Sequence, residues 1–121
     1  MARILVVDEA ENLLKLYQRE LQDDGHEVKT ALGAREAIGC CGLERPDLVI
    51  FDVRHAERVG IEAVAQLKSI NRGVPLILHT AYSPLGEHFA LRLADACVNK
   101  SSDLAELKRV IKDLLSTRAI A

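Results

Sequence analysis

The stretch Leu48-Val49-Ile50-Phe51-Asp52 consists of four apolar residues that stop at a carboxylate. A run that is apolar at every position and too short for a helix predicts a strand buried on both faces. A strand expected at residues 3–7 has the same character from Ile4 to Val7 and is followed directly by Asp8 and Glu9. Strands buried on both faces occur in parallel sheets that helices cover, so the two runs favour an α/β fold.

The rest of the chain alternates in the same way between short apolar runs and helical patterns. We expect further strands at residues 26–31, 75–78 and 96–99. The expected helices are marked by Leu13, Leu14, Tyr17 and Leu21, by residues 34–43, by Ile61, Val64, Leu67 and Ile70, by residues 84–93, and by Leu104, Leu107, Ile111 and Leu114. This order predicts a single (βα)5 domain over residues 1–121, flavodoxin-like in architecture. Its parallel sheet has five strands in the order 2-1-3-4-5 and helices on both faces.

Composition narrows the class of protein. The chain has 121 residues, 49% of them hydrophobic, so it can bury one core without disulfides. A formal net charge of -2 argues against a nucleic-acid partner, which favours a basic excess. Cys40, Cys41 and Cys97 form an odd set with an adjacent pair, as expected in a reducing cytoplasm. No apolar run approaches the roughly 20 residues that span a bilayer, so we expect a cytoplasmic protein without a membrane partner.

Polar residues follow four of the expected strands. They are Asp8 with Glu9, Asp52, Thr80 and Lys100. The carboxyl ends of parallel strands lie along one edge of a sheet, where α/β proteins form their ligand sites. We therefore expect three carboxylates, one hydroxyl and one ammonium to meet in a single crevice.

This set of groups suits phosphoryl chemistry. Crowded carboxylates repel one another unless a cation is present, and hard oxygen ligands favour Mg²⁺. A metal beside Asp52 would neutralise an incoming phosphoryl group, while Thr80 and Lys100 could bind its oxygens. An aspartate at a strand end is often only a turn former, and a loop lysine is often only solvated. Their joint occurrence at successive strand ends favours a functional site.

Five segments in order resemble the receiver domain of two-component signalling, in the CheY-like superfamily. They are residues 4–9, 46–53, 60–62, 75–81 and 98–100. The likeness extends over essentially the whole chain. It implies a phosphorylation-controlled signalling domain that assists only its own phosphorylation and dephosphorylation and is not otherwise an enzyme.

The resemblance implies a role for each residue at the strand ends. Asp52 would accept a phosphoryl group from a sensor histidine kinase, a phosphotransfer protein or a small phosphodonor. Asp8, Glu9, Asp52 and the backbone carbonyl of Arg54 would hold Mg²⁺.

Three further positions would contact the phosphoryl group, namely Thr80, Ala81 and Lys100. The phosphorylated state would change the binding of a downstream protein. In the family the partner usually docks on the face made by the fourth helix, the fifth strand and the fifth helix.

The chain departs from the family pattern at several positions. Glu9 stands where aspartate is commoner, Ala56 and Ser101 stand where the family has proline, and Cys97 stands at the switch position that is usually tyrosine or phenylalanine. Cys97 is too small to replace a ring, which predicts weaker coupling of the site to the output face. These departures favour one alternative, a pseudo-receiver that binds proteins without being phosphorylated.

A nucleotide- or flavin-binding enzyme of similar fold is a second alternative. Such a protein would need a glycine-rich turn after the first strand to approach phosphate closely. Residues 8–12 are Asp-Glu-Ala-Glu-Asn, which would repel phosphate in the absence of a metal. The sequence therefore disfavours this alternative.

Overall fold

The computed structural model describes residues 2–52, 57–71, 73–80, 94–100 and 103–120. The strands are β1 (Arg3–Val7), β2 (Glu27–Ala31), β3 (Leu48–Phe51), β4 (Leu76–Thr80) and β5 (Ala96–Asn99). The described helices are α1 (Glu11–Asp23), α2 (Ala34–Glu44), α3 (Glu57–Ile70) and α5 (Ala105–Ile120). The helix expected at residues 84–93 lies outside the described residues.

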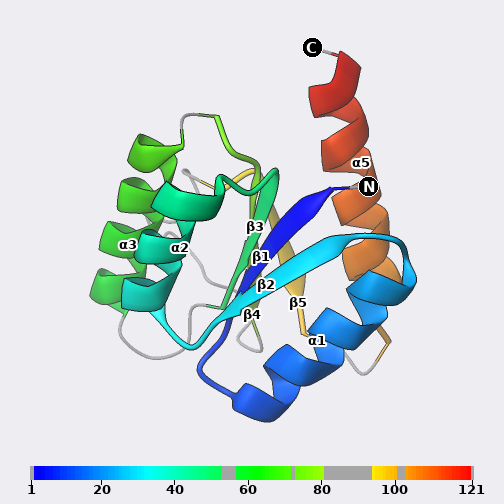
Figure 1. The fold of residues 1–121 in the computed structure, drawn as a ribbon, viewed down its shortest axis with the longest axis horizontal. Helices are drawn as coiled ribbons and strands as arrows, with labels where there is room; N and C mark the ends of the chain where they lie inside the picture. The colour runs from blue at the N-terminus through cyan, green and yellow to red at the C-terminus, as the bar shows by residue number, and fades with distance from the viewer. Residues whose placement is uncertain (1, 53–56, 72, 81–93, 101–102, 121) are drawn as a thin grey trace.

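The five strands form one parallel sheet in the order β2-β1-β3-β4-β5. Helices α2 and α3 cover one face, and α1 and α5 cover the other (Figure 1). The predicted fold class and strand order are thus confirmed. The order reverses at β1, whose neighbours are β2 and β3, so their carboxyl ends frame the edge at which α/β proteins bind ligands.

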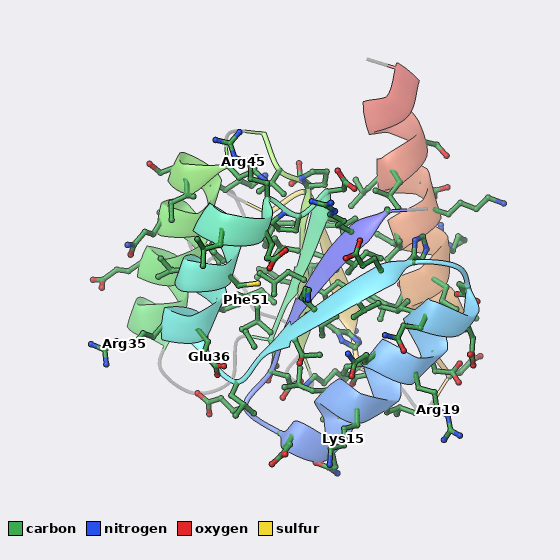
Figure 2. The ribbon with its side chains drawn as sticks, viewed as in Figure 1. Lys15, Arg19, Arg35, Glu36, Arg45 and Phe51 are labelled. Atoms are coloured by element: carbon green, nitrogen blue, oxygen red, sulfur yellow. The ribbon has the colours of Figure 1, made fainter. Side chains whose placement is uncertain are left out.

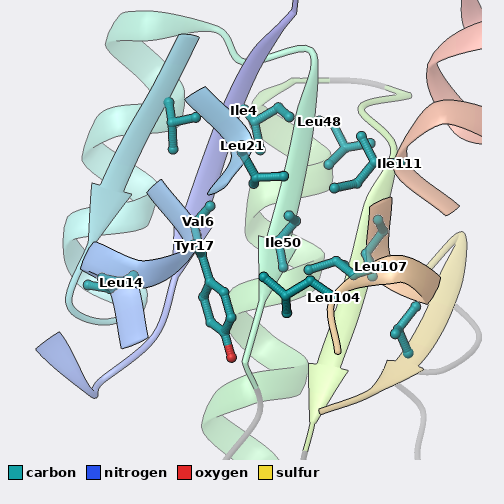
Figure 3. Packing of buried hydrophobic residues seen from close by; sticks show 13 residues of the cluster. Ile4, Val6, Leu14, Tyr17, Leu21, Leu48, Ile50, Leu104, Leu107 and Ile111 are labelled. Atoms are coloured by element: carbon teal, nitrogen blue, oxygen red, sulfur yellow. The ribbon is translucent and has the colours of Figure 1, made fainter. Parts of the chain in front are cut away.

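Alternate residues of the central strands enter two separate cores. Ile4 and Val6 of β1 pack with α1 and α5, whereas Leu5 and Val7 pack with α2 and α3. All four side chains are at most 2% exposed. This two-sided burial explains why residues 4–7 of the strand are all apolar. Figure 3 shows the core between the sheet and helices α1 and α5.

Two elements differ from the sequence prediction by more than one residue at an end. Strand β4 continues through His79 to Thr80, two residues beyond the expected end, because polar residues there still form the sheet ladder with β5. Helix α3 begins at Glu57, four residues before Ile61, because the spacing of apolar residues does not by itself show where a helix begins.

Several charged side chains lie at the surface of the molecule. Figure 2 shows Lys15, Arg19, Arg35 and Arg45 on the periphery, whereas Phe51 lies inside, between the sheet and α2. Within the described residues, no helix has both the length and the apolar character needed to cross a membrane.

Candidate functional site

Asp8 and Asp52 occupy equivalent places at the ends of adjacent strands. The backbone N–H of Asp52 donates to the carbonyl of Val7 at 2.9 Å, and that of Asp8 donates to the carbonyl of Ala31 at 3.1 Å. The parallel ladder of β2, β1 and β3 therefore continues one residue beyond the strands. It delivers both carboxylates to the same edge, as the sequence predicts.

Lys100 joins the two carboxylates. Its Nζ lies 2.7 Å from Asp8 Oδ2 and 3.3 Å from Asp52 Oδ1. The three side chains are 12%, 1% and 3% exposed, in the order Lys100, Asp8 and Asp52. Asp8 Oδ1 also accepts the backbone N–H of Ala10 at 2.8 Å, which fixes its carboxylate. Three of the predicted site residues are thus brought together.

The charge balance of this cluster is negative. One ammonium faces two buried carboxylates, and each charge has little access to water. Their oxygens are hard donors of the kind that Mg²⁺ binds alongside retained water molecules. Asp8 and Asp52 therefore fit a divalent cation by charge, donor type and proximity.

Glu9 takes a different position. It is exposed, whereas the neighbouring Asp8 is 2% exposed. Across the part of the chain that the structure describes, no group of three or more His, Cys, Asp or Glu side chains is arranged to hold a metal. The close cluster of carboxylates is formed by Asp8 and Asp52, and the place of Glu9 in it stays a prediction.

The remaining predicted site residues can be placed only in part. Thr80 ends β4, in register with Asn99, the residue directly before Lys100. The backbone of Thr80 therefore lies at the same edge as the acidic cluster. Arg54 and Ala81 lie outside the described residues. Cys97 lies on β5, where it is paired in register with Leu78 of β4, and it is exposed.

Two aromatic side chains lie behind the cluster. The rings of Tyr17 on α1 and His79 on β4 meet edge to face, with centroids 5.2 Å apart. Burial, with smaller contributions from Asp8 and Asp52, raises the pKa of Tyr17 to about 12. The sequence assigned Tyr17 only to the buried stripe of a helix, because a helical period does not show which strand residue it meets.

His79 lies beside the site, as its place at a strand end suggests. It is 2% exposed. Burial, with a further contribution from Lys100, lowers the pKa of His79 to about 4, although Asp8 opposes the shift. His79 is therefore a neutral imidazole near neutral pH.

Comparison with known proteins finds related sequences. The model of the response regulator receiver domain family matches residues 4–112. The chain is 33% identical over 118 residues to the transcriptional regulatory protein PrrA of Mycobacterium tuberculosis, a match that covers 96% of this chain and 51% of PrrA.

The same fold is found in solved structures. The response regulator TrrA of Thermotoga maritima, in complex with Mg²⁺ and BeF, has a TM-score of 0.86 and 36% identity. This match covers 94% of the present chain and 99% of TrrA. TrrA in complex with the histidine kinase ThkA has a TM-score of 0.85 and 36% identity, covering 95% and 99%.

The chain spans about a quarter to a half of the length of the curated relatives it matches. Its likeness to them is therefore a likeness to one domain. The family match covers most of the chain and includes both buried carboxylates and Lys100. The chain belongs to the response regulator receiver domain family of two-component signalling.

Proposed function

We propose that Asp52 accepts a phosphoryl group in a reaction that depends on Mg²⁺, and that the modification changes the binding of a partner protein. The observation that carries this proposal is the position of Lys100 Nζ, within 3.3 Å of both Asp52 and Asp8. One cation is thus already held where a phosphoryl group on Asp52 would develop negative charge.

The chemistry assigned to Asp52 is nucleophilic. A carboxylate oxygen of Asp52 forms a bond to phosphorus as the bond from phosphorus to the donor breaks. The donor is the imidazole nitrogen of a kinase histidine or the acetate oxygen of acetyl phosphate, and the electron pair of the broken bond leaves with it. Positioning and neutralisation of charge supply most of the acceleration in such transfers.

The surrounding residues each bind a different part of the incoming phosphoryl group or the metal. Lys100 pairs with one oxygen of the incoming group, and the Thr80 hydroxyl and the Ala81 backbone N–H donate to others. Bound Mg²⁺ would supply the rest of the charge neutralisation, held by Asp8, Asp52 and the backbone carbonyl of Arg54, with Glu9 as a further ligand. The fit of Asp8 and Asp52 to a divalent cation supports this assignment.

The partners follow from the same chemistry. A sensor histidine kinase or phosphotransfer protein supplies the phosphoryl group, as suggested by the similarity to TrrA, which has been seen in complex with a histidine kinase. We assign the downstream partner to the face that includes β5 and α5. Exposed Cys97 lies on this face.

The test is acetyl phosphate labelling followed by mass spectrometry of the intact protein. Wild type with Mg²⁺ should gain one phosphoryl group, and Asp52→Asn should gain none. Asp47→Asn is a matched control, because this carboxylate lies at the other end of β3 and accepts the backbone N–H of Arg3. Labelling of Asp52→Asn at the wild-type level would refute the proposal.

A pseudo-receiver is the second candidate, and the exposure of Glu9 favours it. A protein of this kind would bind its partner equally well with and without a phosphodonor. Absence of labelling in the wild type, with both acetyl phosphate and a histidine kinase as donors, would select this candidate.

A further inference from the structure

The buried imidazole of His79 has no role in the phosphoryl transfer proposed for Asp52. Measured over the whole residue, Asp8 and His79 are the buried polar or charged residues among those that the structure describes, each 2% exposed. Asp8 is accounted for by its bonds to Lys100 and Ala10. His79 instead occupies a strand position that an aliphatic residue could fill, and burying a polar ring costs free energy unless its nitrogen atoms are hydrogen-bonded.

The location of His79 links it to Lys100. His79 is paired in register with Val98, two residues before Lys100. Residues two apart in an extended chain face the same side, so His79, Val98 and Lys100 share one side of the sheet. The ammonium of Lys100 is also close enough to contribute to the low pKa of His79, second to burial.

Tyr17 packs edge to face against the imidazole of His79. The two rings meet at an interplanar angle of 61°, and Tyr17 is 4% exposed. In Figure 3 the hydroxyl end of Tyr17 points the same way as the strand arrowheads, toward the edge with the acidic cluster. The ring pair therefore lies between the core that packs against α1 and the end of β5, which Lys100 directly follows.

We propose that His79 is a positioning residue, whose neutral ring, held by Tyr17, keeps the Lys100 ammonium between Asp8 and Asp52. An uncharged flat ring fills the space behind the lysine without repelling it. A cation at position 79 would push the ammonium toward solvent. The benefit for phosphoryl transfer rests on the proposed function, whereas the placement of Lys100 can be measured without any phosphodonor.

The direct test is the ¹H–¹⁵N spectrum of the lysine side-chain ammonium groups at low temperature and mildly acidic pH. Only ammonium groups held in ion pairs exchange slowly enough to give cross-peaks. Lys68 is an internal reference, because its Nζ lies 2.6 Å from Asp95 Oδ2 and 2.7 Å from the Val74 carbonyl, in a contact separate from the cluster. Lys108 should also give a peak, because its Nζ lies 3.1 Å from Glu20 Oε1 and 3.4 Å from Asp24 Oδ2. Lys100→Arg and Lys68→Arg therefore identify the peaks of Lys100 and Lys68.

His79→Val should remove the Lys100 peak and leave the Lys68 peak, whereas His79→Phe, which keeps a neutral ring, should retain both. Ile77→Ala is the matched control, because Ile77 lies on the same strand and in the core with Val98, two residues from His79. It should retain both peaks. Tyr17→Leu, which leaves β4 intact, should weaken the Lys100 peak selectively and replaces His79→Val if that variant fails to fold.

Phosphorylation rates supply a second readout. His79→Val should slow labelling by acetyl phosphate roughly tenfold, because small displacements of a positioned group are costly. The same substitution should have no further effect in a Lys100→Met background.

Several outcomes would overturn the proposal. They are a Lys100 peak unchanged in His79→Val, a wild-type spectrum with the Lys68 peak but no Lys100 peak, or an equal loss of rate in both backgrounds. If the Lys100 peak depends on His79 but Asp52 accepts no phosphoryl group, the positioning role stands and the proposed function fails.

Discussion

Lys100 Nζ lies closer to Asp8 than to Asp52, at 2.7 Å against 3.3 Å. The ammonium therefore pairs most tightly with a carboxylate that we assign to Mg²⁺ rather than with the phosphoryl acceptor. Because a carboxylate oxygen that binds one cation binds a second less strongly, Mg²⁺ and Lys100 are expected to compete for Asp8. This competition makes the stability of the protein depend on the metal in a way that substitution can reveal.

Lys100→Met should destabilise the protein in metal-free buffer. Removing one partner of a buried ion pair leaves an uncompensated charge and costs about 3–5 kcal/mol of unfolding free energy. Mg²⁺ should restore more stability to the variant than to wild type, because binding to the folded state alone is stabilising and the competing ammonium is gone. Urea unfolding in EDTA and in Mg²⁺ measures both effects.

Lys68→Met is the control for this experiment. Lys68 and Asp95 also form an ion pair, but their side chains are 21% and 39% exposed. The expected loss is smaller, roughly 1–2 kcal/mol, and should be the same with and without Mg²⁺. An equal response of wild type and Lys100→Met to Mg²⁺ would show that the two cations do not share Asp8.

The parts of the site that sequence could predict are those that depend on strand ends. Asp8, Asp52 and Lys100 follow apolar runs, and parallel topology requires such residues to share an edge, so their meeting followed from the pattern. The position of Glu9 did not, because adjacent residues of an extended chain point to opposite sides and sequence does not show which side the loop will bury. Tyr17 and His79 were also unpredictable as a pair, because their contact joins a helix to a strand that is far away in the chain.

His79 should make stability depend on pH. Its pKa is about 4 in the folded protein and 6.5 in a model peptide, so the unfolded chain binds more protons between these values. Unfolding free energy therefore rises with pH across this window, and the contribution is fully present above about pH 6.5. Wild type should lose on the order of 2–4 kcal/mol from this group between pH 6.5 and 4. Urea unfolding of wild type and His79→Phe across that range isolates the contribution of His79 to the pH dependence of the unfolding free energy.

His26→Gln serves as the reference variant. Burial also lowers the pKa of His26, but His26 is only half-buried and lies away from the acidic cluster. Its removal should flatten the pH dependence less than His79→Phe does. Parallel pH curves for wild type and His79→Phe would mean that His79 titrates normally.

The core on the side of α2 and α3 can be tested with a matched pair of leucines. Leu78 on β4 is 0% exposed, and Leu43 on α2 is 87% exposed. Leu78→Ala should cost about 2–5 kcal/mol, because it removes buried methylenes and leaves a cavity. Leu43→Ala should change stability by less than about 0.5 kcal/mol, because leucine and alanine both favour helices and the Leu43 side chain is exposed to solvent. Similar losses for the two variants would contradict the burial described for β4.

Cys97 provides a test of how the signal leaves the site. The thiol lies on an edge strand, exposed and in register with Leu78, one residue before the strand position paired with His79. We expect phosphorylation to draw Thr80 toward the phosphoryl group. A side chain as small as that of Cys97 would fill little of the space that this leaves, so phosphorylation should repack the face containing α5 only modestly. A ring at this position would supply the missing volume, and coupling requires such a two-state element.

We therefore expect Cys97→Tyr to fold with nearly wild-type stability, because the position is exposed, and to respond more strongly to activation. Amide chemical shifts recorded with and without Mg²⁺ and beryllofluoride, a phosphoryl mimic, provide the measurement. In wild type the shifts should be large near Asp52 and small across residues 84–110, and the substitution should enlarge the second set alone. Cys97→Ser keeps the size of the side chain and should behave as wild type. Shifts across residues 84–110 of wild type as large as those near Asp52 would show that another side chain already performs the role of the ring.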